Sequence, residues 1–309
     1  MDGRNSSLFV DFVLKGLPHI DNVQVPVFLI LSIIYICTLV GNVLIIGVVK
    51  GTPSLHTPMY FFLINLSFLD VCLSSVTLPR LLGNVLSMKR IPFGECVAQL
   101  YFFHFLASAE CFLYTVMAYD RYAAICQPLH YRRLMSWKVS MCLAFGSWLA
   151  GSLHSITHTV LTFHLPFCHS NEIDYFFCDI IPVLKLACAD TTLNKTMILA
   201  NIASISLSCF ILIMISYIHI IVAIMKIKTA DGRNKAFSTC VSHVTVVALF
   251  YIPCVFNYMR LDSGSSIDKA AAVFYTLLTP SLNPIVYSLR NKDVKEALKK
   301  ISERLAKYS

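Results

Sequence analysis

The chain has 309 residues, of which 57% are hydrophobic and only 14% are charged. A soluble domain carries about 25% charged residues, so this chain has too few charges to cover its apolar surface in water. With a mean hydropathy of +0.69, the composition excludes a cytosolic enzyme and an intrinsically disordered chain. The net charge of +8 would indicate nucleic-acid binding only if it were clustered in one soluble domain.

Seven long apolar stretches predict membrane-spanning helices, because about 20 apolar residues cross the hydrocarbon core. Such unbroken stretches argue against a β-barrel, whose strands alternate over about ten residues. We predict an all-α integral membrane protein: a seven-transmembrane helix bundle over residues 25–290, an extracellular tail over 1–24 and a cytoplasmic segment over 291–309. The spans lie at about 25–49, 59–78, 97–122, 139–161, 197–225, 236–258 and 270–289.

Positive charge is unevenly divided between the connecting segments. With the amino terminus outside, sixteen of the 25 Lys and Arg residues fall on the inner loops and tail. The positive-inside rule therefore predicts a plasma-membrane protein with an extracellular amino terminus and a cytoplasmic carboxyl terminus. The excess charge belongs to this one face, so no nucleic-acid partner is expected. Asn5 begins an Asn-Ser-Ser glycosylation sequon on the outer tail.

The segment after the seventh span has the pattern of a short amphipathic helix. Its apolar stripe consists of Val294, Leu298, Ile301 and Leu305, and its basic residues off that stripe are Lys292, Lys295, Lys299 and Arg304. Such a helix lies in the membrane interface, with its basic residues attracted to the lipid bilayer. A frayed cytoplasmic tail is the alternative.

Four of the twelve cysteines lie outside the spans, at the outer end of the third span and in the long loop before the fifth. They are Cys96, Cys168, Cys178 and Cys188. An oxidising compartment favours two disulfides, although four cysteines allow three pairings. A Cys/His zinc cluster is the rival interpretation, since three histidines are near this loop in the sequence: His158, His164 and His169.

Two short motifs occupy corresponding inner ends of the bundle. Asp120-Arg121-Tyr122 ends the third span, and Asn283-Pro284-Ile285-Val286-Tyr287 lies in the seventh. At these places they resemble the motifs of rhodopsin-like G-protein-coupled receptors. Longer strings narrow the resemblance to the olfactory (odorant) receptors of the tetrapod-type branch: Pro58–Leu63, Ser216-Tyr217, Lys235–Cys240 and Pro280–Asn291.

The resemblance implies a receptor rather than an enzyme, with no required cofactor. The disulfides would then be Cys96–Cys178 and Cys168–Cys188. Asp120 and Arg121 would form an ion pair that locks the resting state. The implied partner is a heterotrimeric G protein of the stimulatory, olfactory type, which raises cyclic AMP. The residues of the activation switch would be Asp120, Arg121, Tyr122, Tyr217, Asn283, Pro284 and Tyr287.

A ligand pocket is expected to open outward between the third, fifth, sixth and seventh spans. Its mixture of apolar residues and a few hydrogen-bonding groups suits a small volatile odorant. The expected lining is His104, Ala107, Ser108, Cys111, Asn201, Ile205, Tyr251, Val255, Tyr258, Val273 and Thr276. His104 and Cys111 could alternatively hold a soft metal for a thiol ligand.

Asp70 and Glu110 are acids placed within predicted spans, where ionisable groups are functional candidates. With Asn42 and Asn283 they would form an oxygen-rich site that suits a hard cation such as sodium. Two protonated acids, hydrogen-bonded to their neighbours, are the alternative.

A membrane transporter or channel for a small solute is the main rival function. Such a protein would need discontinuous helices in paired halves, or a ring of charges around a pore. The sequence shows neither. A membrane enzyme would need a catalytic motif, and no His–Glu metal motif or Gly-x-Ser-x-Gly elbow is found.

Overall fold

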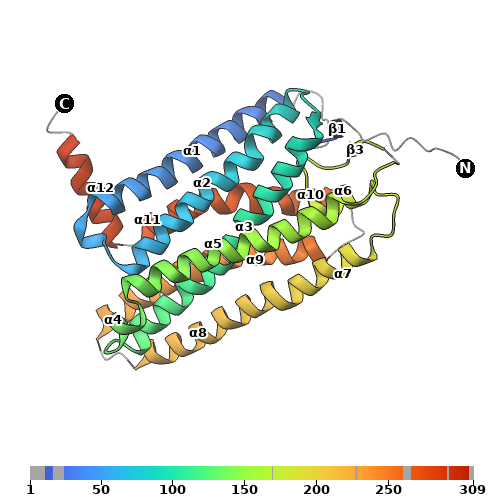
Figure 1. Ribbon diagram of the computed structural model, residues 1–309. Helices are drawn as coiled ribbons and strands as arrows, with labels where there is room; N and C mark the ends of the chain where they lie inside the picture. The colour runs from blue at the N-terminus through green and yellow to red at the C-terminus, as the bar shows by residue number, and fades with distance from the viewer. Residues whose placement is uncertain are drawn as a thin grey trace, which may run out of the picture.

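The computed structural model describes residues 11–16, 24–168, 170–226, 229–259, 266–290 and 292–305. Long helices run side by side in an elongated bundle (Figure 1). They are α1 (Gln24–Gly51), α2 (Pro58–Val85), α3 (Phe93–Cys126), α5 (Trp137–Phe163), α7 (Thr192–Asn201) with α8 (Leu207–Met225), α9 (Ala230–Met259), and α10 (Ser266–Val273) with α11 (Thr279–Arg290). Short π-helices, η2 (Ile202–Ser206) and η3 (Phe274–Leu278), join α7 to α8 and α10 to α11. The remaining helices are η1 (Pro53–Leu55), α4 (Tyr131–Leu134), α6 (Ile180–Leu184) and α12 (Lys292–Leu305).

Five helical segments among the described residues are long and apolar enough to cross a membrane: α1, α2, α3, α5 and Thr192–Met225. A shorter apolar stretch, His243–Met259, belongs to α9. With α10–α11 these segments make a seven-span bundle. The helices are longer than the apolar stretches in the sequence. Helix α3 has 34 residues, a length of about 50 Å. The hydrocarbon core is about 30 Å thick, so the helix ends reach into the headgroup layers.

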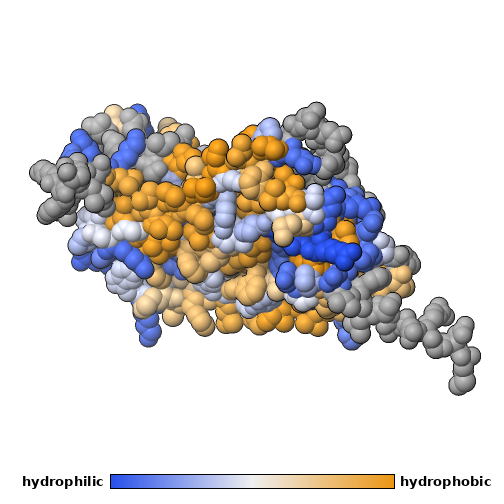
Figure 2. Space-filling model, turned by 90° about the horizontal axis from the view of Figure 1, so that it is seen from above, coloured by the Kyte–Doolittle hydropathy of each residue, from blue (hydrophilic) through white to orange (hydrophobic). Residues whose placement is uncertain are grey.

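The bundle exposes apolar side chains and buries polar ones, the reverse of a soluble protein. Ile33 on α1 is 60% exposed, whereas Asn42, on the opposite face of the same helix, is fully buried. Figure 2 shows the same distribution on the face seen from above, where an apolar belt lies between hydrophilic ends. Because lipid supplies no hydrogen bonds, the polar side chains find their partners between the helices.

Close approach of α5 to α3 depends on a glycine. A Cβ at Gly151 would lie 2.7 Å from the backbone nitrogen of Ala109 and 2.8 Å from the carbonyl oxygen of Phe105. Small residues at such crossings allow backbones to meet. Ser155 uses the short distance, donating a 2.6 Å hydrogen bond to the carbonyl oxygen of Tyr101.

A three-stranded sheet that the sequence analysis did not predict closes one end of the bundle. Strand β1 (Asp11–Leu14) pairs antiparallel with β2 (Arg90–Pro92) and parallel with β3 (Glu172–Ile173). These strands are two to four residues long, too short for a detectable alternation in the sequence. The sheet joins three segments far apart in the chain at the end opposite α12 (Figure 1).

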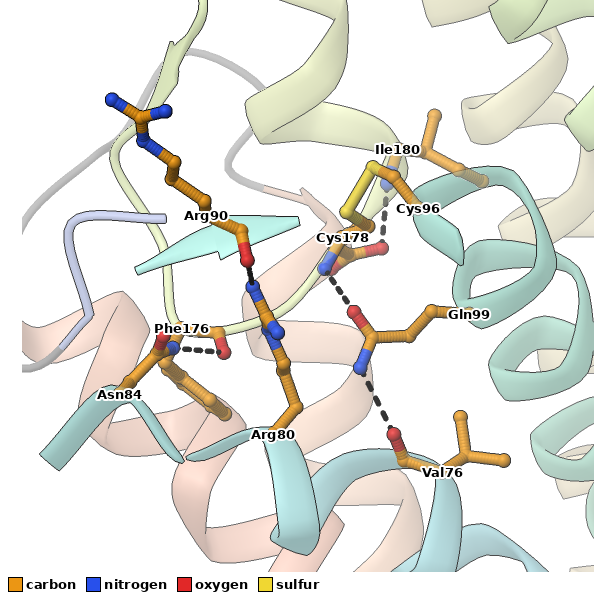
Figure 3. Close-up of a disulfide and its surroundings, with 10 residues drawn as sticks. Val76, Arg80, Asn84, Arg90, Cys96, Gln99, Phe176, Cys178 and Ile180 are labelled. Atoms are coloured by element: carbon orange, nitrogen blue, oxygen red, sulfur yellow. Dashed lines mark hydrogen bonds between the residues drawn. A yellow bond between two sulfur atoms is a disulfide. The ribbon is translucent and has the colours of Figure 1, made fainter. Parts of the chain in front are cut away.

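Two disulfides fix the loop between α5 and α7. Cys96 at the start of α3 is bonded to Cys178, and Cys168 is bonded to Cys188. Gln99 supports the first bond: its Oε1 accepts a 2.9 Å hydrogen bond from the Cys178 N–H, and its Nε2 donates to the carbonyl oxygen of Val76 at 2.9 Å (Figure 3).

These disulfides remove the thiolates that the rival zinc cluster would need. His158 faces Asn201 within the bundle, and His169 lies outside the described residues. Asn5 with its sequon also lies outside them. Asn194-Lys195-Thr196 also matches the sequon pattern. Asn194 is buried and donates a 2.9 Å hydrogen bond to the carbonyl oxygen of Leu161.

Helix α12 lies against the ends of α1 and α11 at the other end of the bundle (Figure 1). Its apolar side is packed inward, with Val294 fully buried and Ala297 buried. Lys295 and Lys299 are exposed on the opposite side. The segment after the seventh span is therefore a docked amphipathic helix over the residues described.

Candidate functional site

A cavity of about 90 Å³ lies between α3, α5, α7–η2 and α9, beneath α6. Nine of the eleven residues expected from the sequence line it: His104, Ala107, Ser108, Cys111, Asn201, Ile205, Tyr251, Val255 and Tyr258. Its walls are mostly apolar, with a few polar groups that hydrogen-bond to one another.

Val273 and Thr276, the two expected residues of the seventh span, are not part of this lining. Thr276 is fully buried, and its hydroxyl donates a 2.6 Å hydrogen bond to the carbonyl oxygen of Ala272 in its own helix. The described cavity therefore lacks a wall from the seventh span, and the roles of these two residues stay predictions. Sequence spacing identifies residues that share a helix face, but it does not set the rotation of that helix in the bundle.

Two histidines of α5 form a polar wall that the sequence analysis missed. His154 Nδ1 lies 2.9 Å from Ser108 Oγ, and His158 is hydrogen-bonded to the amide of Asn201. Both histidines line the cavity. Their i, i+4 spacing places them on one helix face, a signal that was available in the sequence.

Asp179 lies behind the cavity wall and is bonded to two lining residues, His104 and Tyr258; we call these three residues the roof of the cavity. Asp179 follows Cys178, so the disulfide to α3 fixes its position. Its carboxylate lies 2.9 Å from His104 Nε2 and accepts hydrogen bonds from the Tyr258 hydroxyl at 3.1 and 3.2 Å and from the Ile180 N–H at 2.7 Å. The side chain is 1% exposed. The roof therefore links the loop to α3 and α9.

Cys111 and Tyr251 form the floor, with 2.9 Å between the Cys111 sulfur and the Tyr251 hydroxyl. His104 is bonded to Asp179 instead. The two side chains proposed for a soft metal thus have separate partners. Within the described ranges, no group of three or more His, Cys, Asp and Glu residues is arranged to hold a metal ion.

The buried acids meet in the middle of the bundle. Asn283 Nδ2 donates to both carboxylate oxygens of Asp70 at 3.0 Å and to the Tyr114 hydroxyl at 3.3 Å. Tyr114 in turn donates to Glu110. Asn42 is buried but bonds backbone carbonyls, of Thr38 at 3.0 Å and Pro280 at 3.1 Å. Tyr114 connects the two acids, a role that was not expected from the sequence.

Asp120 has a hydrogen-bond partner that the sequence did not indicate: it accepts a 2.9 Å hydrogen bond from the Tyr131 hydroxyl of α4. Arg121, the next residue of α3, is buried beside it. The ion pair between Asp120 and Arg121 stays a prediction. Burial, followed by the nearby Asp120, raises the pKa of Tyr131, so its hydroxyl remains a donor.

The remaining switch residues contact other helices of the bundle. Tyr217 on α8 lies 2.7 Å, hydroxyl to Nδ1, from His243 on α9. Tyr122 packs its ring against His219. Pro284 packs closely on α1 at Gly41. A Cβ added to Gly41 would lie 3.0 Å from the Cγ of Pro284. The side chain of Tyr287 lies outside the described set.

Comparison with known proteins decides the family. Residues 31–304 match the family model described as "Olfactory receptor". Human olfactory receptor 10G4 is 51% identical over 98% of both chains, and human olfactory receptor 10G2 is 53% identical over 97% of this chain and 98% of its own. Mouse olfactory receptor 4E2 is 49% identical over 98% of this chain and 99% of its own. The chain belongs to the olfactory receptor family.

The protein is therefore an odorant receptor of the G-protein-coupled type, and it is not an enzyme. It is a multi-pass protein of the plasma membrane. The receptor assignment displaces the transporter or channel that the composition alone had left open. In this receptor, the cavity-lining residues of α3 lie between Phe103 and Cys111, and the buried Arg121 lies closer to the end of α3 that precedes α4.

Proposed function

We propose that this receptor binds a small, mostly apolar volatile in the cavity between α3, α5, α7–η2 and α9. We further propose that binding activates a G protein of the stimulatory, olfactory type and raises cyclic AMP. The observation that carries the ligand proposal is the cavity itself, which holds nine residues expected from the sequence. Family membership supports coupling to a G protein.

The cavity favours a ligand with few polar atoms. Ser108 is bonded to His154, Asn201 to His158, and Asp179 to both His104 and Tyr258. A strongly polar ligand would have to break these pairs, each worth roughly 0.5–1.5 kcal/mol net. Apolar contact with Ile198, Ile202 and Ile205 would instead supply the binding energy through burial.

The proposed orientation places the sheet and both disulfides outside the cell and α12 inside. Disulfides persist in oxidising compartments, and Cys96–Cys178 and Cys168–Cys188 lie at the sheet end. Most Lys and Arg residues belong to the loops and tail on the other side of the membrane, as the positive-inside rule requires.

Helix α9 offers a route between ligand and G protein. It carries Tyr251 and Tyr258 at the cavity and His243, bonded to Tyr217, nearer the proposed inner face. A ligand that prefers one position of α9 would shift the equilibrium between resting and active states. Arg121, 5% exposed, would become available to the G protein in the active state.

The test is a cyclic AMP reporter assay against a chemically broad odorant panel, with surface expression measured on the same cells. We expect a concentration-dependent rise for the wild type and none for Arg121→Ala at equal surface level. A response that persists in Arg121→Ala would contradict the proposed switch. Ion flux without cyclic AMP would contradict the choice of G protein pathway.

We also propose that sodium binds between the buried acids. Three buried oxygens there have no hydrogen-bond partner, namely Glu110 Oε2, Asn42 Oδ1 and Asn283 Oδ1, and Asp70 supplies a carboxylate. Oxygen donors of this kind fit a hard cation. The alternative, two protonated acids, predicts no dependence on the cation.

The sodium proposal is tested by the thermal unfolding of purified receptor in sodium chloride and in choline chloride at one ionic strength. We expect a higher midpoint temperature in sodium for the wild type and no difference for Asp70→Asn. Equal midpoints for the wild type in both salts would reject the site and favour the protonated pair.

A further inference from the structure

A second and larger cavity lies away from the odorant site, between α8, α9 and η3. Its volume is about 660 Å³. None of its fourteen described lining residues is charged, and most are apolar. The floor includes Tyr217, Ile224 and Cys240, which are buried. The rim includes Ile221, Val244 and Ile252, which are 50%, 42% and 69% exposed. We call this feature the α8–α9 groove. Its exposed rim belongs to the lipid-facing side of the bundle.

Among the lining residues that the structure describes, both hydroxyl groups of the groove are bonded within the protein. The Tyr217 hydroxyl is bonded to His243 Nδ1 at 2.7 Å. The Thr245 hydroxyl donates to the carbonyl oxygen of Val241 in its own helix at 2.7 Å. An occupant with polar atoms along its length would lose their hydrogen bonds here. The chemistry of the walls therefore selects a hydrocarbon chain.

The length of the groove fits such a chain. Its wall on α9 extends from Phe237 to Pro253, a distance of about 24 Å at 1.5 Å per residue. One leaflet contributes about half of the 30 Å hydrocarbon core. The groove is thus long enough to hold a complete acyl chain.

Positive charge marks one end of the groove. Lys226 follows α8 two residues after Ile224, and Arg233 precedes Phe237 by one helical turn; both are exposed. Residues 226–235 contain four Lys or Arg residues and one Asp. Basic residues at the membrane surface attract anionic lipid by about 1 kcal/mol each.

We propose that the α8–α9 groove binds an anionic phospholipid of the bilayer. One acyl chain lies along the groove, and the headgroup phosphate lies against Lys226 and Arg233. The lipid touches Tyr217, which bonds α9 through His243, so its presence contributes to the contact between α8 and α9. Binding at this site requires neither an odorant nor a G protein.

The test uses the full-length receptor in nanodiscs that contain a phosphatidylserine with a photoreactive diazirine in its acyl chain. A phosphatidylcholine with the same labelled chain provides the comparison. After irradiation, labelled peptides are mapped. We expect labelling concentrated in Met214–Lys226 and Phe237–Pro253, with phosphatidylserine labelling exceeding phosphatidylcholine labelling.

Two sets of variants separate chain binding from headgroup binding. Ala248→Trp fills the groove and should remove the labelling. Gly146→Trp is the matched control, since a Cβ at this lipid-facing position of α5 meets no atom within 4 Å.

The headgroup contact is tested by charge removal. Lys226→Gln with Arg233→Gln should lower the preference for phosphatidylserine about fivefold per charge removed. Lys138→Gln, an exposed position at the start of α5, should leave it unchanged.

Three outcomes would overturn the proposal: labelling spread evenly over the lipid-facing helices, unchanged labelling in Ala248→Trp, or equal labelling by the two lipids in the wild type. Displacement of the label by cholesterol but not by unlabelled phosphatidylserine would identify a sterol as occupant and would also reject it. Far-ultraviolet circular dichroism of each variant confirms that the helices are retained.

Discussion

Asn283 and Asp70, 213 residues apart in the chain, form a two-fold hydrogen bond in the middle of the bundle, with both carboxylate oxygens 3.0 Å from Nδ2. Asp70 is fully buried and Asn283 is 1% exposed. Since water does not reach these two buried side chains, each depends on the other for hydrogen bonds. The bond joins α2 to α11 and fixes the seventh span in register with the second.

Asn283→Leu should destabilise the receptor because it leaves the Asp70 carboxyl without its amide donor. The expected cost is about 1–3 kcal/mol for an unsatisfied buried group, seen as a lower midpoint of thermal unfolding. The double variant Asp70→Leu/Asn283→Leu should recover part of this loss. Additive losses in the double variant would show that the two residues do not interact.

Gly151→Ala should push α5 away from α3, because its Cβ would meet backbone atoms of Ala109 and Phe105 at 2.7 and 2.8 Å. Overpacking of this kind costs about 1–3 kcal/mol. Gly146→Ala is the matched control on the same helix, where the added Cβ meets open space. We expect Gly146→Ala to be neutral or stabilising, and equal effects of the two changes would contradict the described crossing.

The two disulfides should differ in their contributions to stability. Cys96 and Cys178 are separated by 82 residues, and Cys168 and Cys188 by 20. In the chain-entropy account the longer loop contributes about 1 kcal/mol more. Thermal unfolding of Cys96→Ser/Cys178→Ser should therefore show the larger loss than Cys168→Ser/Cys188→Ser, and the reverse order would reject the entropic explanation.

Histidines of α5 should matter to ligand response more than the seventh span does. His154→Leu removes a cavity-lining group bonded to Ser108, so the agonist concentration for half-maximal cyclic AMP should change. Thr276→Val should leave it unchanged, because that hydroxyl is bonded within its own helix. Surface expression of both variants provides the control. A shift in Thr276→Val alone would contradict this ranking and support a ligand contact from the seventh span.

Tyr258→Phe should weaken the roof of the cavity. The change removes the hydroxyl that donates to Asp179 but keeps the ring. The bond joins two receptor residues, so its loss should cost about 0.5–1.5 kcal/mol of stability and, because Tyr258 lines the cavity, should also lower agonist potency. Phe250→Tyr, a change of similar size at another cavity-lining position, tests whether any altered ring gives the same effect. An unchanged potency in Tyr258→Phe would remove Asp179 from the ligand site.

The sequence by itself determined the membrane class and the family. Apolar stretches long enough to cross a bilayer are a local property of the chain, as are the motifs around Arg121 and Asn283. The α3 side of the cavity was also predictable, because His104, Ala107, Ser108 and Cys111 share one helix face at fixed spacing.

Only the tertiary structure decided which helix faces meet. It brought His154 and His158 of α5 to the cavity and did not place Val273 and Thr276 in its described lining. It placed the Tyr131 hydroxyl on Asp120, and it paired β1 with strands from two distant loops. The physical reason is the same in each case: helix rotation and loop pairing depend on contacts between segments far apart in the chain, and no local pattern records them.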